Sequence, residues 1–215
     1  GWTQPRPMHV IRDGAEAVIT PPDTLRVAFI RIDFLSDRGG ATSSGDGKFD
    51  ISGPDTTLPP IDRAPHNRTF FLSHFEALRR YHETQSYGRT RIRGDVWPHI
   101  ENAAYHIKDM ADLGPWEFSI DIYPAAVRMF HTMIAAADSQ SIALGDRIPW
   151  HQYDRIVLIH AGSDLQSDVF QDSKEDIPTF TLTVEDTDAV DVAWVRNLVT
   201  PGDSLAIDRC IIAPE

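Results

Sequence analysis

Apolar side chains recur along this chain with two periods, which predict strands alternating with helices. Residues 26–34 are rich in β-branched and aromatic side chains, typical of a core strand. Within residues 66–86, apolar side chains stand three or four positions apart and a glycine follows at Gly88, which predicts a helix and its end. The positions that carry this helical spacing are Phe71, Phe75, Leu78 and Tyr81.

Residues 89–97 alternate arginines with Thr90, Ile92 and Gly94. A period of two predicts a half-buried strand, and Pro98 is expected to end it. The exposed face of this strand would be a row of arginines, formed by Arg89, Arg91 and Arg93.

The second half of the chain repeats the pattern. Pro124 is well placed to start a helix that runs to about residue 139 and packs on the sheet. Residues 153–162 include four consecutive apolar residues, as expected of a central strand covered on both faces. Residues 179–184 and 204–212 are further strand candidates. This alternation predicts an α/β (α+β) fold with a mixed, mainly parallel sheet backed by helices.

Composition divides the chain into an arm and a domain. Residues 1–22 are punctuated by proline and are predicted to form an extended N-terminal arm. Residues 23–215 are predicted to form a single α/β domain. Within it, residues 36–65 are rich in Gly, Ser, Asp, Thr and Pro without apolar periodicity, which predicts a long surface loop.

Charge and cysteine content exclude several classes of function. The chain has 215 residues and a net charge of -12, which disfavours binding to nucleic acid. Cys210 is the only cysteine, so an internal disulfide and a Cys-rich zinc site are both excluded, and its apolar neighbours predict that it is buried. No apolar run reaches the roughly 18 residues of a membrane-spanning helix, so the chain is not expected to cross a bilayer.

Familiar catalytic motifs are incomplete in this sequence. His82-Glu83 begins like the zinc motif H-E-x-x-H, but Ser86 stands where the second histidine is needed. His74 and His82 could share a helix face as a pair of metal ligands, but surface or capping roles are the favoured interpretation. Neither the G-x-S-x-G of a serine hydrolase nor a phosphate-binding glycine loop is present.

Three weaker candidate sites remain. Asp46 and Asp50 lie in a Gly-rich and Asp-rich stretch that fits either a calcium-binding loop or a plain Asp-Gly turn. His160 ends the predicted central strand, where it either serves a site or fixes the following loop. An acidic segment fits a calcium site, a partner surface or, by default, a solvated face; its acids are Asp164, Asp168, Asp172, Glu175 and Asp176.

Ordered short motifs extend across most of the chain, roughly from residue 27 to residue 210. They are Pro65-His66-Asn67, Phe70-Phe71, Ser73-His74-Phe75, Tyr81-His82-Glu83, Ser86-Tyr87-Gly88, Ile92, Gly94, Val96, Pro98 and His160-Ala161-Gly162. Together they resemble the N-terminal half of the catalytic domain of immune inhibitor A-type secreted zinc metalloproteases.

This resemblance implies the sheet and backing helix of a zincin-like domain, with the zinc-binding helix downstream of the last strand. No residue of this chain matches a zinc ligand or the catalytic glutamate, so we expect no zinc in the chain alone. Three interpretations follow: a non-catalytic subunit derived from the protease fold, an N-terminal fragment of a secreted zinc metallopeptidase, and, more weakly, an unrelated hydrolase that uses His160.

The first interpretation predicts an accessory or structural subunit in a larger protein assembly, which can include membrane proteins. The expected contacts are the arm residues Trp2, Pro5 and Pro7 and the row of arginines. Because the chain begins with Gly1 in place of an initiator methionine, removal of a leader and a cloning remnant are both interpretations. Processing is favoured and predicts a periplasmic or extracellular location.

Overall fold

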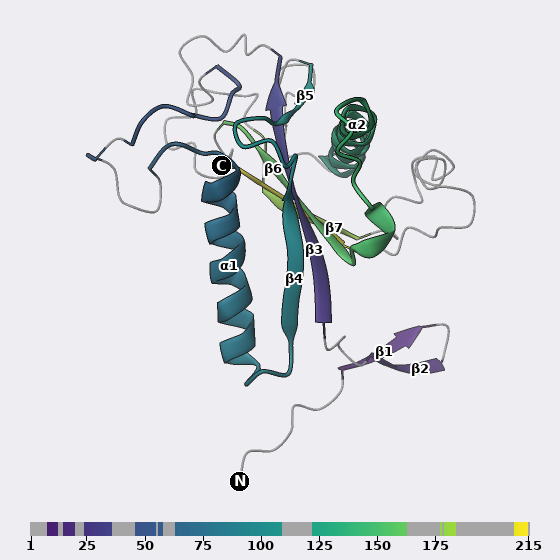
Figure 1. Cartoon of the computed structure of the whole chain (residues 1–215). Coiled ribbons are helices and arrows are strands. Elements are labelled where there is room, and N and C mark those ends of the chain that lie inside the picture. The colour runs from purple at the N-terminus through teal and green to yellow at the C-terminus, as the bar shows by residue number, and fades with distance from the viewer. Residues whose placement is uncertain are drawn as a thin grey trace.

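The computed structural model describes residues 8–12, 15–19, 24–35, 46–54, 56–57, 63–108, 122–162, 177, 179–183 and 209–214. Figure 1 shows a central sheet with one long helix on each side. The strand order is β4-β3-β6-β8-β7, and β5 pairs with β3 beyond the end of β4. The α/β fold predicted from the sequence, with a mainly parallel sheet backed by helices, is therefore confirmed.

Strand β3 (Thr24–Phe34) pairs in parallel with β4 (Arg91–Trp97), β5 (Tyr105–Ile107) and β6 (Arg155–His160). Strand β8 (Arg209–Pro214) continues the sheet parallel to β6, and β7 (Phe180–Thr183) closes it antiparallel to β8. The prediction that residues 153–162 hold the central strand is confirmed, since β6 has two neighbours on each side.

Helix α1 (Arg68–Gln85) covers one face of the sheet and lies within the predicted range 66–86. The side chain of Asn67 caps its start by accepting a hydrogen bond of 3.1 Å from the Phe70 N–H. Phe75 packs edge-on against Phe29 of β3, with ring centroids 5.4 Å apart. The apolar face was predicted one turn too long, because Tyr81 is 61% exposed beyond the edge of the core.

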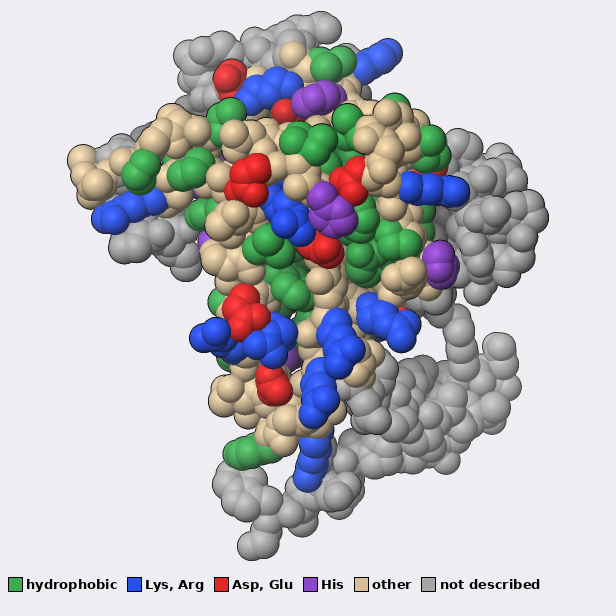
Figure 2. Space-filling view, in the orientation of Figure 1, with side chains coloured by type: hydrophobic (Ala, Val, Ile, Leu, Met, Phe, Trp, Pro, Cys, Tyr) green, Lys and Arg blue, Asp and Glu red, His purple; other side chains and the backbone are tan. Residues whose placement is uncertain are grey.

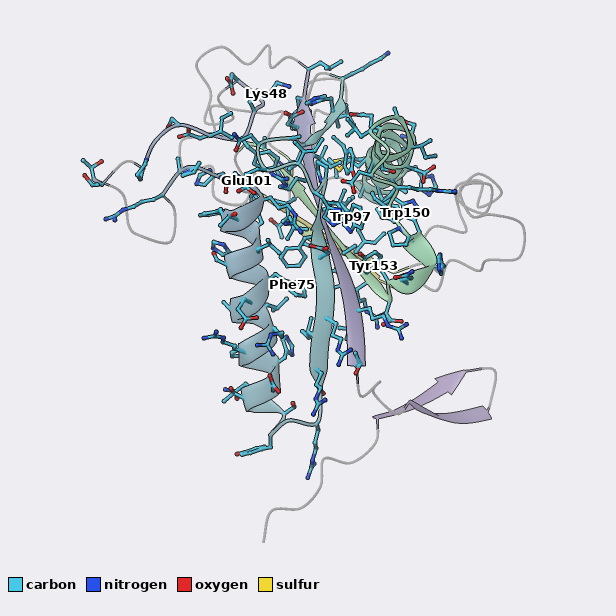
Figure 3. The ribbon with its side chains drawn as sticks, viewed as in Figure 1. Lys48, Phe75, Trp97, Glu101, Trp150 and Tyr153 are labelled. Carbon is cyan, nitrogen blue, oxygen red and sulfur yellow. The ribbon has the colours of Figure 1, made fainter. Side chains whose placement is uncertain are left out.

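Helix α2 (Ile122–Ala143) covers the opposite face and is longer than predicted. Its apolar side chains pack on β3 and β6 in one buried cluster. Figure 3 shows Trp97, Trp150 and Tyr153 close together between the sheet and this helix. The indole N–H groups of both tryptophans have acceptors: Trp97 donates to the Tyr153 hydroxyl at 2.9 Å, and Trp150 of the 3-10 helix η3 (Trp150–Gln152) donates to Asp138 at 2.8 Å.

The first third of the chain holds a pair of strands and a buried loop residue. Within residues 1–22, the predicted N-terminal arm, β1 (Met8–Arg12) pairs antiparallel with β2 (Ala15–Ile19). Part of the 36–65 loop is not on the surface: Phe49 is 8% exposed and packs on Phe71, with ring centroids 5.5 Å apart. Periodicity did not reveal this isolated anchor.

Across the described residues, no helix combines the length and the hydrophobicity that a bilayer-spanning segment needs.

Candidate functional site

Four exposed arginines gather on one face of the sheet near the start of its parallel strands. Arg91 and Arg93 alternate with the buried Ile92, which packs on the α1 side, so both arginines face away from α1. Arg93 pairs in register with Arg26 of β3, which is also exposed. With Arg89 just before β4, these four residues form what we call the arginine face; Figure 2 shows the row of basic side chains along this edge.

None of the four guanidinium groups forms an ion pair or a side-chain hydrogen bond with another described residue. The arginines of α1 behave differently: Arg79 binds Glu76 at 2.7 Å, and Arg80 binds the same carboxylate at 2.6 Å. The arginine face therefore concentrates positive charge that no described carboxylate pairs directly, on a chain whose net charge is -12. The Asp154 carboxylate lies beside this face and accepts a hydrogen bond of 2.8 Å from the Arg26 backbone N–H.

The predicted exposure of Arg89, Arg91 and Arg93 is confirmed, whereas their role as partner contacts stays a prediction. Sequence reasoning missed Arg26, because its place beside Arg93 depends on the pairing of two strands separated by more than fifty residues. The other predicted contacts, Trp2, Pro5 and Pro7, lie outside the described residues.

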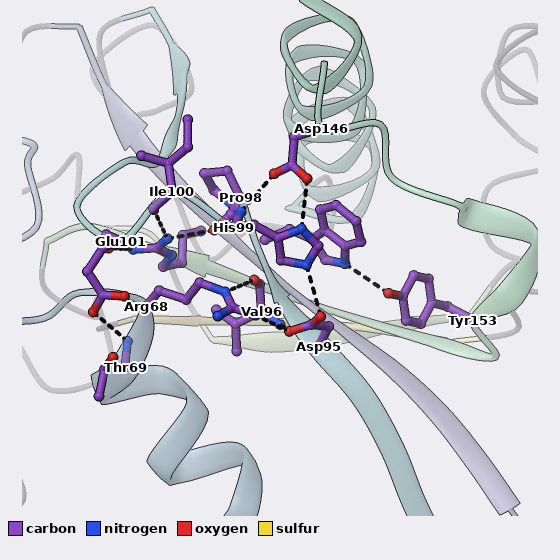
Figure 4. Close-up of polar contacts among 12 residues, drawn as sticks. Arg68, Thr69, Asp95, Val96, Pro98, His99, Ile100, Glu101, Asp146 and Tyr153 are labelled. Carbon is purple, nitrogen blue, oxygen red and sulfur yellow. Dashed lines mark hydrogen bonds and ion pairs between the residues drawn. The ribbon is translucent and has the colours of Figure 1, made fainter. Parts of the chain in front are cut away.

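A second polar cluster holds the segment that links β4 to β5 (Figure 4). Arg31 of β3 is 1% exposed and donates to the backbone carbonyls of Pro98, Ile100 and Glu101, at 2.8 to 2.9 Å. Burial lowers the pKa of Arg31 to about 10, so the guanidinium stays charged at neutral pH. A buried cation thus fixes the path of this connection.

His99 lies in the same connection, between two carboxylates. Its Nδ1 is 2.7 Å from Asp146 Oδ1, in the loop after α2, and its Nε2 is 2.9 Å from Asp95 Oδ2 in β4. The ring of His99 therefore bridges two carboxylates that come from β4 and from the loop after α2. Its ring stacks on Trp97, with centroids 3.9 Å apart.

Asp95 also accepts hydrogen bonds from Arg68 Nη2, at 2.6 Å, and from the Val96 N–H, at 2.8 Å. Partial burial would raise the pKa of Asp95, but the hydrogen bonds from Val96 and His99 and the charge of Arg68 outweigh it and lower the pKa. Both ring nitrogens of His99 lie within hydrogen-bond distance of a carboxylate, so the imidazole is held between Asp95 and Asp146. This cluster therefore joins β4, α1 and the end of α2 mechanically.

A polar pocket of about 700 Å³ opens at the carboxyl end of β3, where ligands commonly gather in parallel sheets. The carboxylate of Asp33 lines this pocket, and its side chain is 9% exposed. Lys48 Nζ lies 3.3 Å from one oxygen of Asp33, and His106 Nδ1 contacts the other. The pocket thus neutralises its own buried charge.

Asp46 and Asp50, the predicted calcium ligands, both line this pocket. Asp46 accepts a hydrogen bond from the Lys48 N–H at 3.0 Å, and Asp50 accepts one from the Ser52 N–H at 2.8 Å. Hydrogen bonds from Ser52 hold the pKa of Asp50 below its usual value. These contacts are those of Asx turns, the alternative interpretation of the sequence.

The described part of the chain contains no group of three or more His, Cys, Asp or Glu side chains arranged to hold a metal. Calcium binding therefore stays a prediction. The acidic residues from Asp164 to Asp176 lie outside the described residues, as does the side chain of Cys210.

The remaining candidate histidines are separated from one another. His160 is fully buried at the end of β6, and its Nδ1 donates to the Ala161 carbonyl at 3.1 Å. On α1, His74 is half-buried and donates to the Phe70 carbonyl at 3.0 Å, whereas His82 is exposed. The hydrogen bond made by His160 is of the kind expected of a residue that fixes the following loop.

Neither the protein-family models nor the curated proteins with which the chain was compared give a match. The resemblance to immune inhibitor A-type proteases therefore stays a prediction from the sequence.

Proposed function

We propose that this chain is a non-catalytic accessory or structural subunit, derived from a metallopeptidase fold, that joins a larger protein assembly through its arginine face. The observation that supports this proposal is the group of four exposed arginines without ion-pair partners among the described residues. Neighbouring guanidinium groups such as Arg26 and Arg93 repel one another, and an anionic partner relieves that repulsion.

A protein partner fits this surface better than nucleic acid. The chain carries a net charge of -12, so most of its surface repels a phosphate backbone at long range. Arginine is also among the residues enriched in protein–protein interfaces. The proposed location is periplasmic or extracellular, in an assembly that can include membrane proteins, with the arm residues Trp2, Pro5 and Pro7 as a second contact.

A zinc metallopeptidase is the second candidate, with this chain as the N-terminal part of its catalytic domain. The observation in its favour is the sheet itself, in which parallel strands backed by α1 end in the antiparallel edge strand β7. In this proposal the zinc ligands and the catalytic glutamate come from another segment. The polar clusters around Arg31 and His99 then only stabilise the fold.

Native mass spectrometry of the protein isolated from its source distinguishes the two proposals. The accessory-subunit proposal expects companions without zinc, and it expects the Arg91→Gln/Arg93→Gln variant to lose them. The matched control, Arg80→Gln/Arg128→Gln, removes the same charge from exposed positions on the two helices and should retain them. Zinc together with an H-E-x-x-H sequence in the isolated species would establish the metallopeptidase.

Isolation of the chain alone would refute the accessory-subunit proposal. Deletion of residues 1–7 tests the arm separately: companions should be lost if the arm is a contact, and their full retention would exclude it.

A further inference from the structure

We infer that the arginine face binds an extended, acidic segment of a partner protein, with carboxylates at every second residue, and that Tyr87 anchors one end of that segment. This inference rests on the proposed function, because it specifies the chemistry of the partner.

The spacing of the arginines favours an extended ligand. Alternate residues of a strand point to the same face and stand about 6.6 Å apart along it. Arg91 and Arg93 follow this period along the edge strand β4, Arg89 lies two residues before Arg91, and Arg26 lies beside Arg93 on the neighbouring strand. A second extended chain repeats its own side chains at the same interval, so its alternate carboxylates can face the successive arginines along β4, with Arg26 as a further donor beside Arg93.

The chemistry of the face favours carboxylates on a protein. A guanidinium group binds a carboxylate through two parallel N–H donors, and these four have no competing partner among the described side chains. Nucleic-acid binding of ordinary strength draws on roughly 6–10 phosphate contacts, more than four arginines supply. A short acidic peptide can be bound by these four guanidinium groups alone. It carries few negative charges, so the rest of this acidic chain repels it only weakly.

Tyr87 is an aromatic residue in the connection from α1 to β4, two residues before Arg89 in the sequence. It follows Ser86, the C-cap of α1, has a φ of 55° and is 82% exposed. The Tyr87 N–H donates to the Thr84 carbonyl at 3.1 Å, and the Gly88 N–H donates to the Glu83 carbonyl at 2.7 Å, as in a Schellman motif.

Glycine is the usual residue at the position that Tyr87 occupies in this motif, because a side chain is strained there. A large exposed aromatic side chain at a strained position does not stabilise the end of α1. Exposed tyrosines are, however, common contact residues in protein interfaces. This combination marks Tyr87 as a binding residue next to Arg89.

Fluorescence anisotropy with a synthetic peptide tests the inference on the whole chain. The probe alternates threonine and glutamate over about eight residues, the length needed to cover the face at roughly 3.3 Å per residue. A control peptide of the same composition has its glutamates contiguous. We expect the alternating peptide to bind more tightly than the control, and its affinity to fall as salt is raised above about 0.1 M.

Matched variants locate the binding surface. Arg91→Gln/Arg93→Gln should weaken binding by about tenfold, whereas Arg80→Gln/Arg128→Gln, which removes the same charge, should leave it unchanged. Tyr87→Gly should weaken binding by about fivefold while the melting temperature stays equal or rises, since glycine relieves the strain. A purely structural role for Tyr87 predicts unchanged binding.

Three results would overturn the inference. Equal binding of both peptides would show a patch of charge without register, and tighter binding of a short oligothymidylate of equal charge would show a preference for phosphates. Absence of binding to every probe would exclude the site. If companions are still found by native mass spectrometry in any of these cases, the proposed function survives and only this account of the partner fails.

Discussion

Gly94 of β4 leaves no room for a side chain against β3, and its replacement tests the geometry of the sheet. It pairs in register with Val27 and has a φ of 158°, which side-chain-bearing residues rarely adopt. A Cβ atom at this position would stand 1.7 Å from the Val27 carbonyl oxygen and 2.7 Å from its carbon. Both neighbours are backbone atoms, so no rotamer change can relieve the clash.

The Gly94→Ala substitution therefore forces the two strands apart. Real Cβ contacts essentially never fall below 3.0 Å, so the Val27 oxygen must move by about 1.3 Å. That shift strains two or three of the hydrogen bonds beside it, at about 1 kcal/mol each, and adds an overpacking cost of about 1–3 kcal/mol. We expect the free energy of unfolding to fall by about 3–6 kcal/mol, and the melting temperature by about 10 °C.

Two other glycines provide controls for this variant. Gly145 has a φ of 68° but nothing within 4 Å of its added Cβ, so Gly145→Ala should cost only about 1 kcal/mol, from backbone strain. Gly53 also has open space and no unusual φ, so Gly53→Ala should be nearly neutral. Urea unfolding of the three variants measures the loss of unfolding free energy in each. A loss for Gly94→Ala no larger than that for Gly145→Ala would refute this account of the β3–β4 contact.

Three further predictions concern the polar clusters. Arg31→Met should lower the free energy of unfolding, measured in urea, by about 3 kcal/mol or more, because three backbone carbonyls lose their donor. Arg31→Lys should recover part of this loss. Equal losses of unfolding free energy in the two variants would contradict the multiple hydrogen bonds. A double-mutant cycle of His99→Gln and Asp146→Asn should give a coupling free energy of about 0.5–1 kcal/mol, since this pair is partly exposed. If the two substitutions lower the free energy of unfolding additively, the contact is excluded. Hydrogen bonds from Arg79 and Arg80 lower the pKa of Glu76 to about 2 from an ordinary 4.5. The stability that ionised Glu76 contributes is therefore complete above pH 4.5 and is lost as the pH falls toward 2. Acid unfolding followed by circular dichroism should show this loss in the wild type and a weaker one in Glu76→Gln, whereas identical profiles would argue against the pairing.

Much of the fold could be predicted from the sequence, because burial of one face leaves a period in the chain. The helical spacing of Phe71 and Phe75 predicted α1, and the alternation around Ile92 predicted both β4 and its exposed arginines. Tyr81 continues the same period but lies past the edge of the sheet. Periodicity alone does not say where the surface that covers a helix ends.

Short elements and isolated contacts escaped prediction for the same reason. Strand β5 has three residues, too few to establish a period, and Phe49 is a single apolar side chain in a polar stretch. Both are held by contacts with residues distant in sequence. Phe49 packs on Phe71, and the His106 side chain of β5 contacts Asp33.

The sequence by itself determined the α/β class, the order of the long elements and the row formed by Arg89, Arg91 and Arg93, because each depends on neighbours a few residues apart. Only the tertiary structure decided that Arg26 stands beside Arg93, and that His99 lies between Asp95 and Asp146. Arg26 and Arg93 come from separate segments, as do His99 and Asp146, and their approach depends on strand register and helix packing. Spacing within one segment carries no information about its register with another.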